Sequence, residues 1–429
     1  MKHPTDLRFF QNEAYALINR LNNLKPFSLN TPMVRAAAIS DAALVGIERL
    51  LAQVSRDLRQ SIQKFLIWLQ QDGAETSTYQ VQQRYTELKM KFNFLLDKLD
   101  IFGDVLTQRG EHDTGIWLAG LDELAKDALI LEAFPLPAPP LICFVERGHG
   151  AAIRRARTRL PGGESNPVAV IQVPRERMVG SGIGSSLIHE VGHQGAALLD
   201  LVESLRVELA QVQQSTDQPL PWQLFHHWIS EIIADFWATA HLGVSATTGL
   251  MGVVSLPRYF VFRIGLEGPH PFPWIRVKTS CALGNALFPH PQWQQWAQRW
   301  ERMYPLNGLD TQKLQIIQAL EQTLPAFAEL VVGHRSQALQ GRALGEIFYA
   351  SERMPDQLLA LHQEWGGQFD TIKKARPSLA FAVIGQAKAA GLLSAKDETD
   401  LLQRLLTQWA WQRSDGKNTI EPSMFIQNF

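Results

Sequence analysis

The sequence predicts a mainly α-helical protein with a small α+β core between two helical regions. Residues 31–133 show the three-and-four spacing of apolar residues that is typical of helices. A cluster of prolines at 135–140 ends this pattern, and short stretches rich in β-branched residues follow it. Helical spacing returns in the last third of the chain. We therefore expect a helical region at 1–135, an α+β core at 136–305 and a helical C-terminal region at 306–429.

Two long helices are expected in the N-terminal region, with a turn at residues 71–73 between them. Their apolar residues follow one helical face each: Leu44, Ile47, Leu51, Val54, Leu58, Ile62, Phe65 and Leu69 in the first, and Tyr85, Leu88, Phe92, Leu95, Leu99 and Phe102 in the second. Such helices pack as an antiparallel hairpin. The hairpin serves either as a structural subdomain or as an arm that docks a protein partner, and the spacing alone does not separate these roles.

Short buried strands are expected in the core at residues 141–145 and 168–173, because both runs are apolar and rich in β-branched residues. A glycine-rich loop at 180–184 follows the second strand. We expect Ser185 or Ser186 to cap the next helix, since serine is among the favoured residues at a helix N-cap.

The C-terminal region is expected to be helical throughout. The helical spacing predicts five segments there: 311–330, 344–352, 357–365, 377–393 and 397–411. No repeat of fixed period joins them, so a solenoid is not expected.

The composition is that of an ordinary globular protein, with 429 residues, 45% hydrophobic residues and 19% charged residues. A formal net charge of -1 indicates neither a nucleic-acid-binding surface nor a polybasic membrane patch.

The two cysteines, Cys143 and Cys281, are expected to be buried thiols rather than a disulfide. We find no signal-peptide pattern and no run of ~20 apolar residues, and therefore expect a cytoplasmic protein without a membrane span.

Residues His189 to His193 form an H-E-x-x-H motif. On a helix, His189 and His193 lie one above the other on the same face, so each can give a ring nitrogen to one zinc ion. Glu190, beside the first histidine, would reach a metal-bound water rather than the metal. Gly192 has no side chain, which would let another backbone come close. The motif predicts a catalytic zinc site with Glu190 as general base.

A second motif lies downstream, where Glu231 and Asp235 are four residues apart and share a helical face. Large apolar residues surround them, and buried carboxylates are costly unless positive groups meet them. Glu231 would be the third zinc ligand, which leaves the fourth position for water. Asp235 would accept a hydrogen bond from the other nitrogen of a ligand histidine. Ala234 would let this helix approach the His189 helix closely.

The two motifs together resemble the signature of the gluzincin metallopeptidases, in which H-E-x-x-H is followed by E-x-x-x-D on a second helix. The resemblance covers residues 141–280 and implies a zincin-like core. The separation of His193 and Glu231 is longer than in thermolysin-like enzymes and closer to that of relatives that process prenylated or misfolded proteins. Some of these relatives carry a His-Pro pair and a later arginine after the glutamate helix, like His270 and Arg276 here.

The resemblance implies zinc-dependent hydrolysis of a protein or peptide substrate. Zinc lowers the pKa of a bound water to near ~7, and Glu190 would take its proton and deliver it to the leaving amine. His270 is the candidate donor to the oxyanion, with Tyr259 as second choice. Arg276 would hold a substrate carbonyl or orient Glu231.

Two other functions fit the same residues. A non-proteolytic zinc protein would use its helical regions for assembly with protein partners. A metal-dependent hydrolase would instead act on a non-peptide amide or ester. Glu190 favours an enzyme, because a site that only binds metal has no use for a general base.

Overall fold

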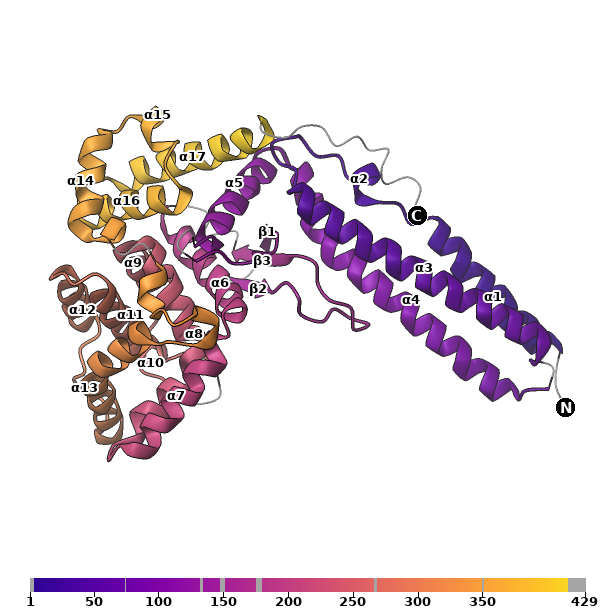
Figure 1. Cartoon of the computed structure of the whole chain (residues 1–429), viewed down its shortest axis with the longest axis horizontal. Coiled ribbons are helices and arrows are strands. Elements are labelled where there is room, and N and C mark those ends of the chain that lie inside the picture. Colours follow the sequence, from indigo (N-terminus) through magenta and orange to yellow (C-terminus); the bar gives the residue numbers. More distant parts are fainter. Residues whose placement is uncertain are drawn as a thin grey trace.

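The chain is mainly helical, with a small three-stranded sheet. The computed structural model describes residues 4–73, 75–131, 134–146, 151–174, 180–265, 268–348 and 351–415. An arm made of α1, α3 and α4 projects from a helical body, and the sheet lies where the two meet (Figure 1). The first helices are α1 (Pro4–Asn22), α2 (Phe27–Asn30), α3 (Asp41–Gln71) and α4 (Thr78–Thr107).

The arm contains the predicted hairpin and one further helix. α3 and α4 pack together through both apolar stripes, and the expected turn at 71–73 separates them. Ser40 caps α3 by accepting a hydrogen bond from the Ala43 N–H, and Ser77 caps α4 in a reciprocal pair with Gln80. α1 lies in the predicted helical region but was not predicted as a separate helix, and it packs against both long helices through Phe10, Ala14, Leu17 and Leu21.

The sheet consists of β1 (Leu141–Glu146), β2 (Ala152–Arg154) and β3 (Ala169–Pro174). β3 is central, parallel to β1 and antiparallel to β2. The two predicted strands are confirmed to within one residue, whereas β2 was not predicted.

The sheet separates two apolar cores, because alternate residues of a strand point to opposite faces. Cys143 and Ile171 belong to the core of the body, while Ile142 and Val170 belong to the core of the arm. Burial on both faces explains why the two longer strands are continuously apolar rather than alternating.

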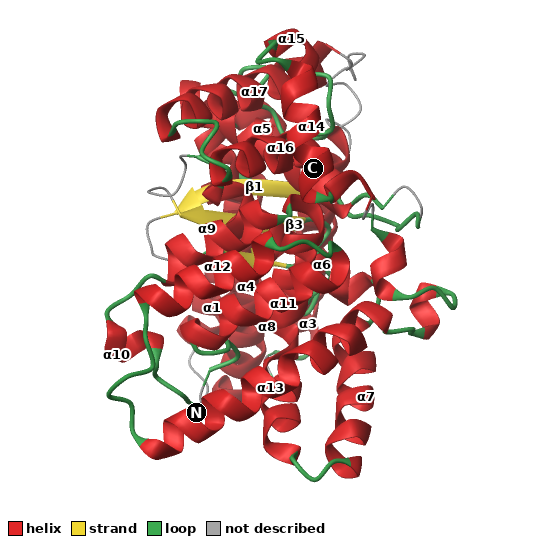
Figure 2. Cartoon of the chain, turned by 90° about the vertical axis from the view of Figure 1, so that its left-hand side faces the viewer, coloured by secondary structure: helices red, strands yellow, loops and turns green. Residues whose placement is uncertain are grey.

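The body is built from helices around α8, as the view from its far side shows (Figure 2). Its α-helices are α5 (His112–Leu129), α6 (Gly182–Leu198), α7 (Leu201–Ser215), α8 (Pro219–Leu242), α9 (Val244–Val254), α10 (Arg258–Val261), α11 (Pro273–Leu287), α12 (Gln292–Met303), α13 (Thr311–Gly333), α14 (Pro355–Trp365), α15 (Phe369–Ile372), α16 (Pro377–Ala389) and α17 (Ala395–Asp415). Its short 3₁₀ helices are η1 (Gln108–Gly110), η3 (Gln337–Leu339), η4 (Leu344–Ile347) and η5 (Ser351–Arg353).

One predicted helix, at 344–352, is wrong. The described residues there form the 3₁₀ turns η4 and η5, and Phe348 between them has an extended backbone. The Phe348 ring packs edge-on against Trp237 and His241 of α8, with ring centroids 5.0 and 5.5 Å apart. Packing of this ring therefore outweighs the local helical spacing.

The start of α6 also differs from the prediction. The helix begins at Gly182 after Ser181, so residues 182–184 are helical and neither predicted serine is its cap. A β-carbon on Gly184 would lie 2.6 Å from the Phe381 ring of α16, so glycine permits this close packing inside the helix. The Ser185 hydroxyl instead donates a hydrogen bond to the Ala246 carbonyl in α9 at 2.9 Å.

Cys143 and Cys281 are buried and not joined by a disulfide, as predicted. No helix in the described part of the chain combines the length and apolar character needed to cross a bilayer.

Candidate metal site

Two crossing helices, α6 and α8, position the predicted ligands. α6 carries His189, Glu190 and His193, and α8 carries Glu231 and Asp235. Glycines of α6 face α8 at the crossing, where Gly195 lies under the Trp237 indole. α6 also packs against β2 and β3, so the sheet supports the helix from its other side.

The structure brings together the three predicted ligands. Ligand atoms of His189, His193 and Glu231 all lie within 4.8 Å of one another. The Nε2 atoms of His189 and His193 are 3.3 and 3.6 Å from the two carboxylate oxygens of Glu231. Ligands at ~2.0–2.1 Å from a tetrahedral zinc ion would be about 3.3 Å apart, so the spacing suits a small divalent cation.

The chemistry of the donor set also fits a cation. Glu231 Oε2 is buried and has no well-oriented hydrogen-bond donor, although His270 Nε2 lies 2.9 Å away. His189 Nδ1 is 2.8 Å from Asp235 Oδ1, an arrangement that suits an N–H donating to the carboxylate. With the proton on Nδ1, the lone pair of Nε2 is directed at the space beside Glu231.

Arg276 of α11 contacts Asp235 rather than Glu231. Its Nε and Nη2 donate hydrogen bonds of 2.7 and 2.9 Å to the two oxygens of Asp235. A bidentate arginine fixes the plane of a carboxylate, so Arg276 holds Asp235, which in turn holds His189. Burial opposes the charge of Arg276, but Asp235 raises the pKa of its guanidinium above the usual value.

The carboxylates of the site differ in their proton affinity. Burial raises the pKa of Glu190, although the charges of His189 and His193 oppose the rise. Burial would also raise the pKa of Glu231, but contacts with the surrounding histidines outweigh it and hold that pKa far below the usual value. A carboxylate with a raised pKa next to one that stays ionised is the arrangement expected for a proton-transfer group beside a ligand.

Asp235 and His189 form a coupled pair. Burial raises the pKa of Asp235, but the charges of Arg276 and His189 lower it well below the usual range. Burial would lower the pKa of His189, but Asp235 and Glu231 raise it to about 9. Protons and cations therefore compete for this imidazole, and metal affinity is expected to fall at low pH.

The candidate oxyanion donors lie in different settings. His270, in the loop before α11, has 53% of its side chain exposed and borders Glu231. Tyr259 is 71% exposed on α10 and contacts Phe260. The sequence did not single out His227, whose Nε2 lies 3.0 Å from the Gly268 carbonyl. This contact ties α8 to the loop that carries His270, and the adjacent histidine pair four residues before Glu231 was its only signal in the sequence.

No protein-family model matches this chain, and no curated protein or solved structure matches it either. The resemblance to gluzincins therefore depends on the motifs and on the geometry described above.

Proposed function

We propose that the chain is a zinc-dependent peptidase of gluzincin type. The observation that carries the proposal is the cluster of His189, His193 and Glu231 ligand atoms within 4.8 Å, with the buried Glu190 beside it. A site that only needed to bind a metal would gain nothing from a buried carboxylate with a raised pKa. The packing of α6 against a small mixed sheet supports a zincin-like core.

The donor set favours zinc among the common cations. Two imidazoles and one carboxylate are typical of catalytic zinc, whereas magnesium and calcium prefer oxygen ligands alone. The exposed fractions of the three side chains lie between 10% and 16%, so the cluster is sheltered but reachable from solvent. Three protein ligands leave a position for a water or a substrate oxygen.

Each residue has a distinct role in the proposed reaction. Zinc supplies Lewis-acid polarisation and an acidified water when it is bound. Glu190 would accept a proton from the attacking water at its carboxylate and would return it to the leaving nitrogen. His270 borders the same space and would donate to the carbonyl oxygen of the substrate as charge develops there. Arg276 and Asp235 keep the His189 ring in one orientation.

The substitution Glu190→Gln tests the proposal. We expect the variant to keep its zinc and to lose hydrolysis of a quenched fluorescent peptide library by at least about 100-fold, which is the usual contribution of a general base. Glu203→Gln on α7 is the matched control, because Glu203 is exposed and pairs only with Arg206 among the described residues.

Each result has a definite meaning. Full hydrolysis by Glu190→Gln would remove Glu190 from the mechanism. A zinc-loaded wild type that cleaves no peptide would contradict the peptidase proposal, and cleavage of non-peptide esters or amides by the same protein would favour the other hydrolase class.

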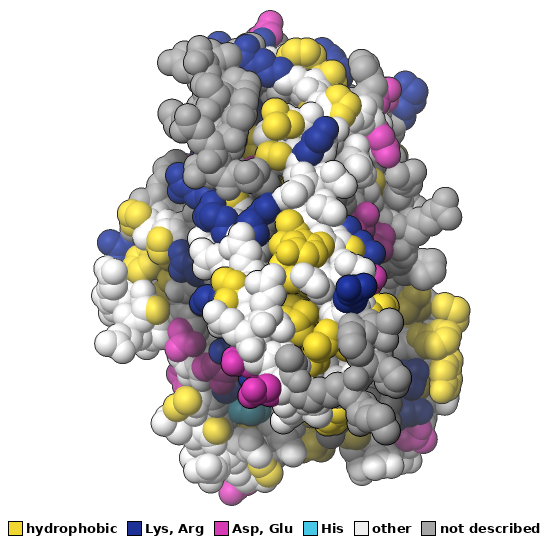
Figure 3. Space-filling model, turned by 90° about the vertical axis from the view of Figure 1, so that its right-hand side faces the viewer, with side chains coloured by type: hydrophobic (Ala, Val, Ile, Leu, Met, Phe, Trp, Pro, Cys, Tyr) yellow, Lys and Arg dark blue, Asp and Glu magenta, His cyan; other side chains and the backbone are white. Residues whose placement is uncertain are grey.

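Exposed apolar residues on the arm favour one alternative, a metal-binding assembly protein. Several large apolar side chains of α1, α3 and α4 are exposed: Phe9, Tyr15, Ile67, Tyr79 and Met90. The space-filling view toward the end of the arm shows apolar side chains among charged ones (Figure 3).

In this alternative the metal is structural, so a chelator would unfold the core. In the peptidase the chelator would silence activity and leave the fold intact.

A further inference from the structure

A cavity of about 870 Å³ lies at the start of α6, where α6, α9, α12 and α16 meet. His189 is seven residues further along α6 than Gly182 at the cavity wall, a distance of about 10 Å along the helix axis at 1.5 Å per residue. None of the predicted zinc ligands lines the cavity. It is therefore a second concave site on the helix that carries the metal ligands.

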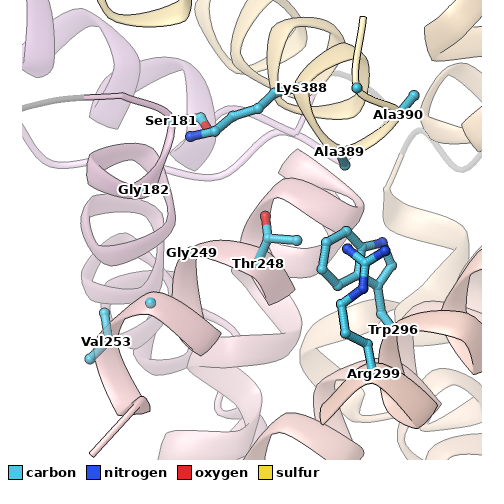
Figure 4. A pocket seen from close by; sticks show the side chains of 12 residues that line it. Ser181, Gly182, Thr248, Gly249, Val253, Trp296, Arg299, Lys388, Ala389 and Ala390 are labelled. Carbon is cyan, nitrogen blue, oxygen red and sulfur yellow. The ribbon is translucent and has the colours of Figure 1, made fainter. Parts of the chain in front are cut away.

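The charge of this cavity is one-sided. Among the described residues that line it, the charged ones are Arg299 and Lys388, and none is acidic. In Figure 4, Lys388 and Ser181 lie together on one side of the hollow, while Arg299 and Trp296 lie on the other. The Arg299 guanidinium stacks on the Trp296 ring at 4.2 Å, which holds the cation at the wall.

The two cations are held differently. Lys388 pairs with the fully buried Glu398, whose other oxygen accepts the Ser181 backbone N–H at 2.9 Å. For Arg299, no acidic partner is found in the described part of the chain. A carboxylate, phosphate or sulfonate group would therefore meet Arg299 most strongly, with Lys388 adding a weaker attraction.

Ser181 adds a hydroxyl to the lining of the cavity. Ser181 is only 4% exposed, and its hydroxyl caps no backbone N–H of α6 although it stands at the N-cap position. A buried hydroxyl favours a hydrogen-bonding partner, and in this place the partner can come from the cavity. The first turn of α6 also presents backbone N–H groups beside it.

Small residues of α9, among them Gly249 and Gly252, line one side of the cavity. Gly249 of α9 lies against Ser185 of α6, where an added β-carbon would be 2.5 Å from the Ser185 Cβ. One turn further along α9, a β-carbon on Gly252 would meet nothing within 4 Å. The helices thus diverge at Gly252, which leaves room beside α9 for an apolar group.

We propose that this cavity is a binding site for a small organic anion with a flat apolar body. Arg299 recognises the acid group, and the apolar body lies beside α9 near Gly252. Lys388 lies with Ser181 on the opposite side of the cavity, and its charge adds a weaker attraction for the anion. The site is separate from the metal cluster, and it would place the ligand against the first turn of α6.

The test uses anilinonaphthalene sulfonate, a fluorescent aromatic anion, with the full chain. We expect one probe per chain by calorimetric titration, with affinity that falls as salt is added. Gly252→Leu adds bulk at the cavity wall from a β-carbon that meets nothing within 4 Å, and it should weaken binding by at least about 10-fold. Arg299→Ala should weaken it by about 3- to 10-fold. Lys388 is unsuitable for substitution, because its loss would leave the buried Glu398 without its cation.

Gly333→Leu is the matched control, since Gly333 ends α13 outside this cavity and its added β-carbon also meets open space. It should bind the probe as wild type does, and all variants should keep the same zinc content. Non-saturable binding, equal affinity in wild type and Gly252→Leu, or equal loss in Gly333→Leu would overturn the proposal. If Gly252→Leu fails to fold, as judged by circular dichroism, Arg299→Ala decides, because Arg299 lies on the surface and its loss leaves the core intact.

Discussion

Gly192 of α6 lies directly against Ala234 of α8: a β-carbon on Gly192 would be only 2.9 Å from the Ala234 Cα. Carbon atoms in contact prefer about 3.5–4.0 Å, so any side chain here must push the helices apart. His193 follows Gly192, and Glu231 lies one turn before Ala234. The close crossing therefore sets the distance between the proposed ligands on the two helices.

Gly192→Val is expected to lower both stability and zinc affinity. Overpacking at the crossing should reduce the free energy of unfolding by about 1–3 kcal/mol. The same displacement moves His193 away from Glu231, so we expect zinc affinity to fall at least about 10-fold, since metal sites tolerate distance errors of only ~0.2 Å. Urea unfolding and zinc titration measure the two effects.

Gly182→Val on the same helix is the control, because its added side chain starts in open space. Similar effects of both substitutions would contradict this explanation.

Asp235→Asn tests the relay from Arg276 through Asp235 to His189. The amide keeps the size of the side chain but removes the charge that meets both neighbours. Because such partners fix the ring of a ligand histidine, zinc affinity should fall about 10- to 100-fold. The free energy of unfolding should also fall by about 3–5 kcal/mol, since Arg276 is left with an uncompensated buried charge.

The control for Asp235→Asn is Asp370→Asn, which changes an exposed carboxylate paired with Lys373. It should leave zinc affinity unchanged. Unaltered zinc binding by Asp235→Asn would mean that Asp235 does not orient His189.

Zinc should stabilise the wild type and not the ligand variants. A ligand that binds only the folded state adds about 2.7 kcal/mol when its concentration is 100 times Kd. We therefore expect zinc to raise the Tm of the wild type, and a chelator to reverse the rise. His193→Ala and Glu231→Ala should show little or no rise, and elemental analysis should find their zinc content sharply reduced.

His226→Ala is the matched control on α8, because His226 is outside the cluster of ligand atoms. It should behave as the wild type. Full zinc content in Glu231→Ala would place the third ligand elsewhere, with His270 as the nearest candidate.

The sequence predicted those parts of the fold in which buried residues recur at a regular spacing along the chain. The apolar stripes of α3 and α4 and the apolar runs of β1 and β3 are local patterns, so they could be read without the tertiary structure. The same holds for His189, His193 and Glu231, because spacing on a helix brings the ligands of each motif to one face. α1 carries the same kind of pattern at Phe10, Ala14, Leu17 and Leu21, but the predicted helical region 1–135 contained no separate helix at that place.

The remaining features depend on contacts between distant residues. α6 begins early because Gly184 packs on Phe381 of α16, nearly two hundred residues away. The 344–352 segment departs from a helix because Phe348 packs on α8. Arg276 pairs with Asp235 across two helices, and nothing in the spacing of its own motif indicated that partner. β2 was too short for a pattern to be seen.

His241, near the end of α8, should make the protein less stable at mildly acidic pH. Burial lowers its pKa from the usual 6.5 to about 3, and the charges of Arg353 and Arg376 add to the effect. The unfolded chain therefore takes up a proton between these values while the folded chain does not. Stability is fully present above about pH 6.5 and is lost as pH falls toward 3, by up to about 1.4 kcal/mol for each pH unit.

The comparison with His241→Phe isolates this residue, because every other titrating group is shared. Phenylalanine suits the site, where the imidazole already contacts the rings of Trp237 and Phe348. Urea unfolding between pH 7 and 4 should show a steeper fall for the wild type than for the variant, and His362→Phe on α14 should follow the wild type. Parallel plots of the free energy of unfolding against pH for wild type and His241→Phe would contradict this prediction. They would mean that His241 gains its proton as readily in the folded protein as in the unfolded chain, so that the buried ring does not cause the loss of stability in acid.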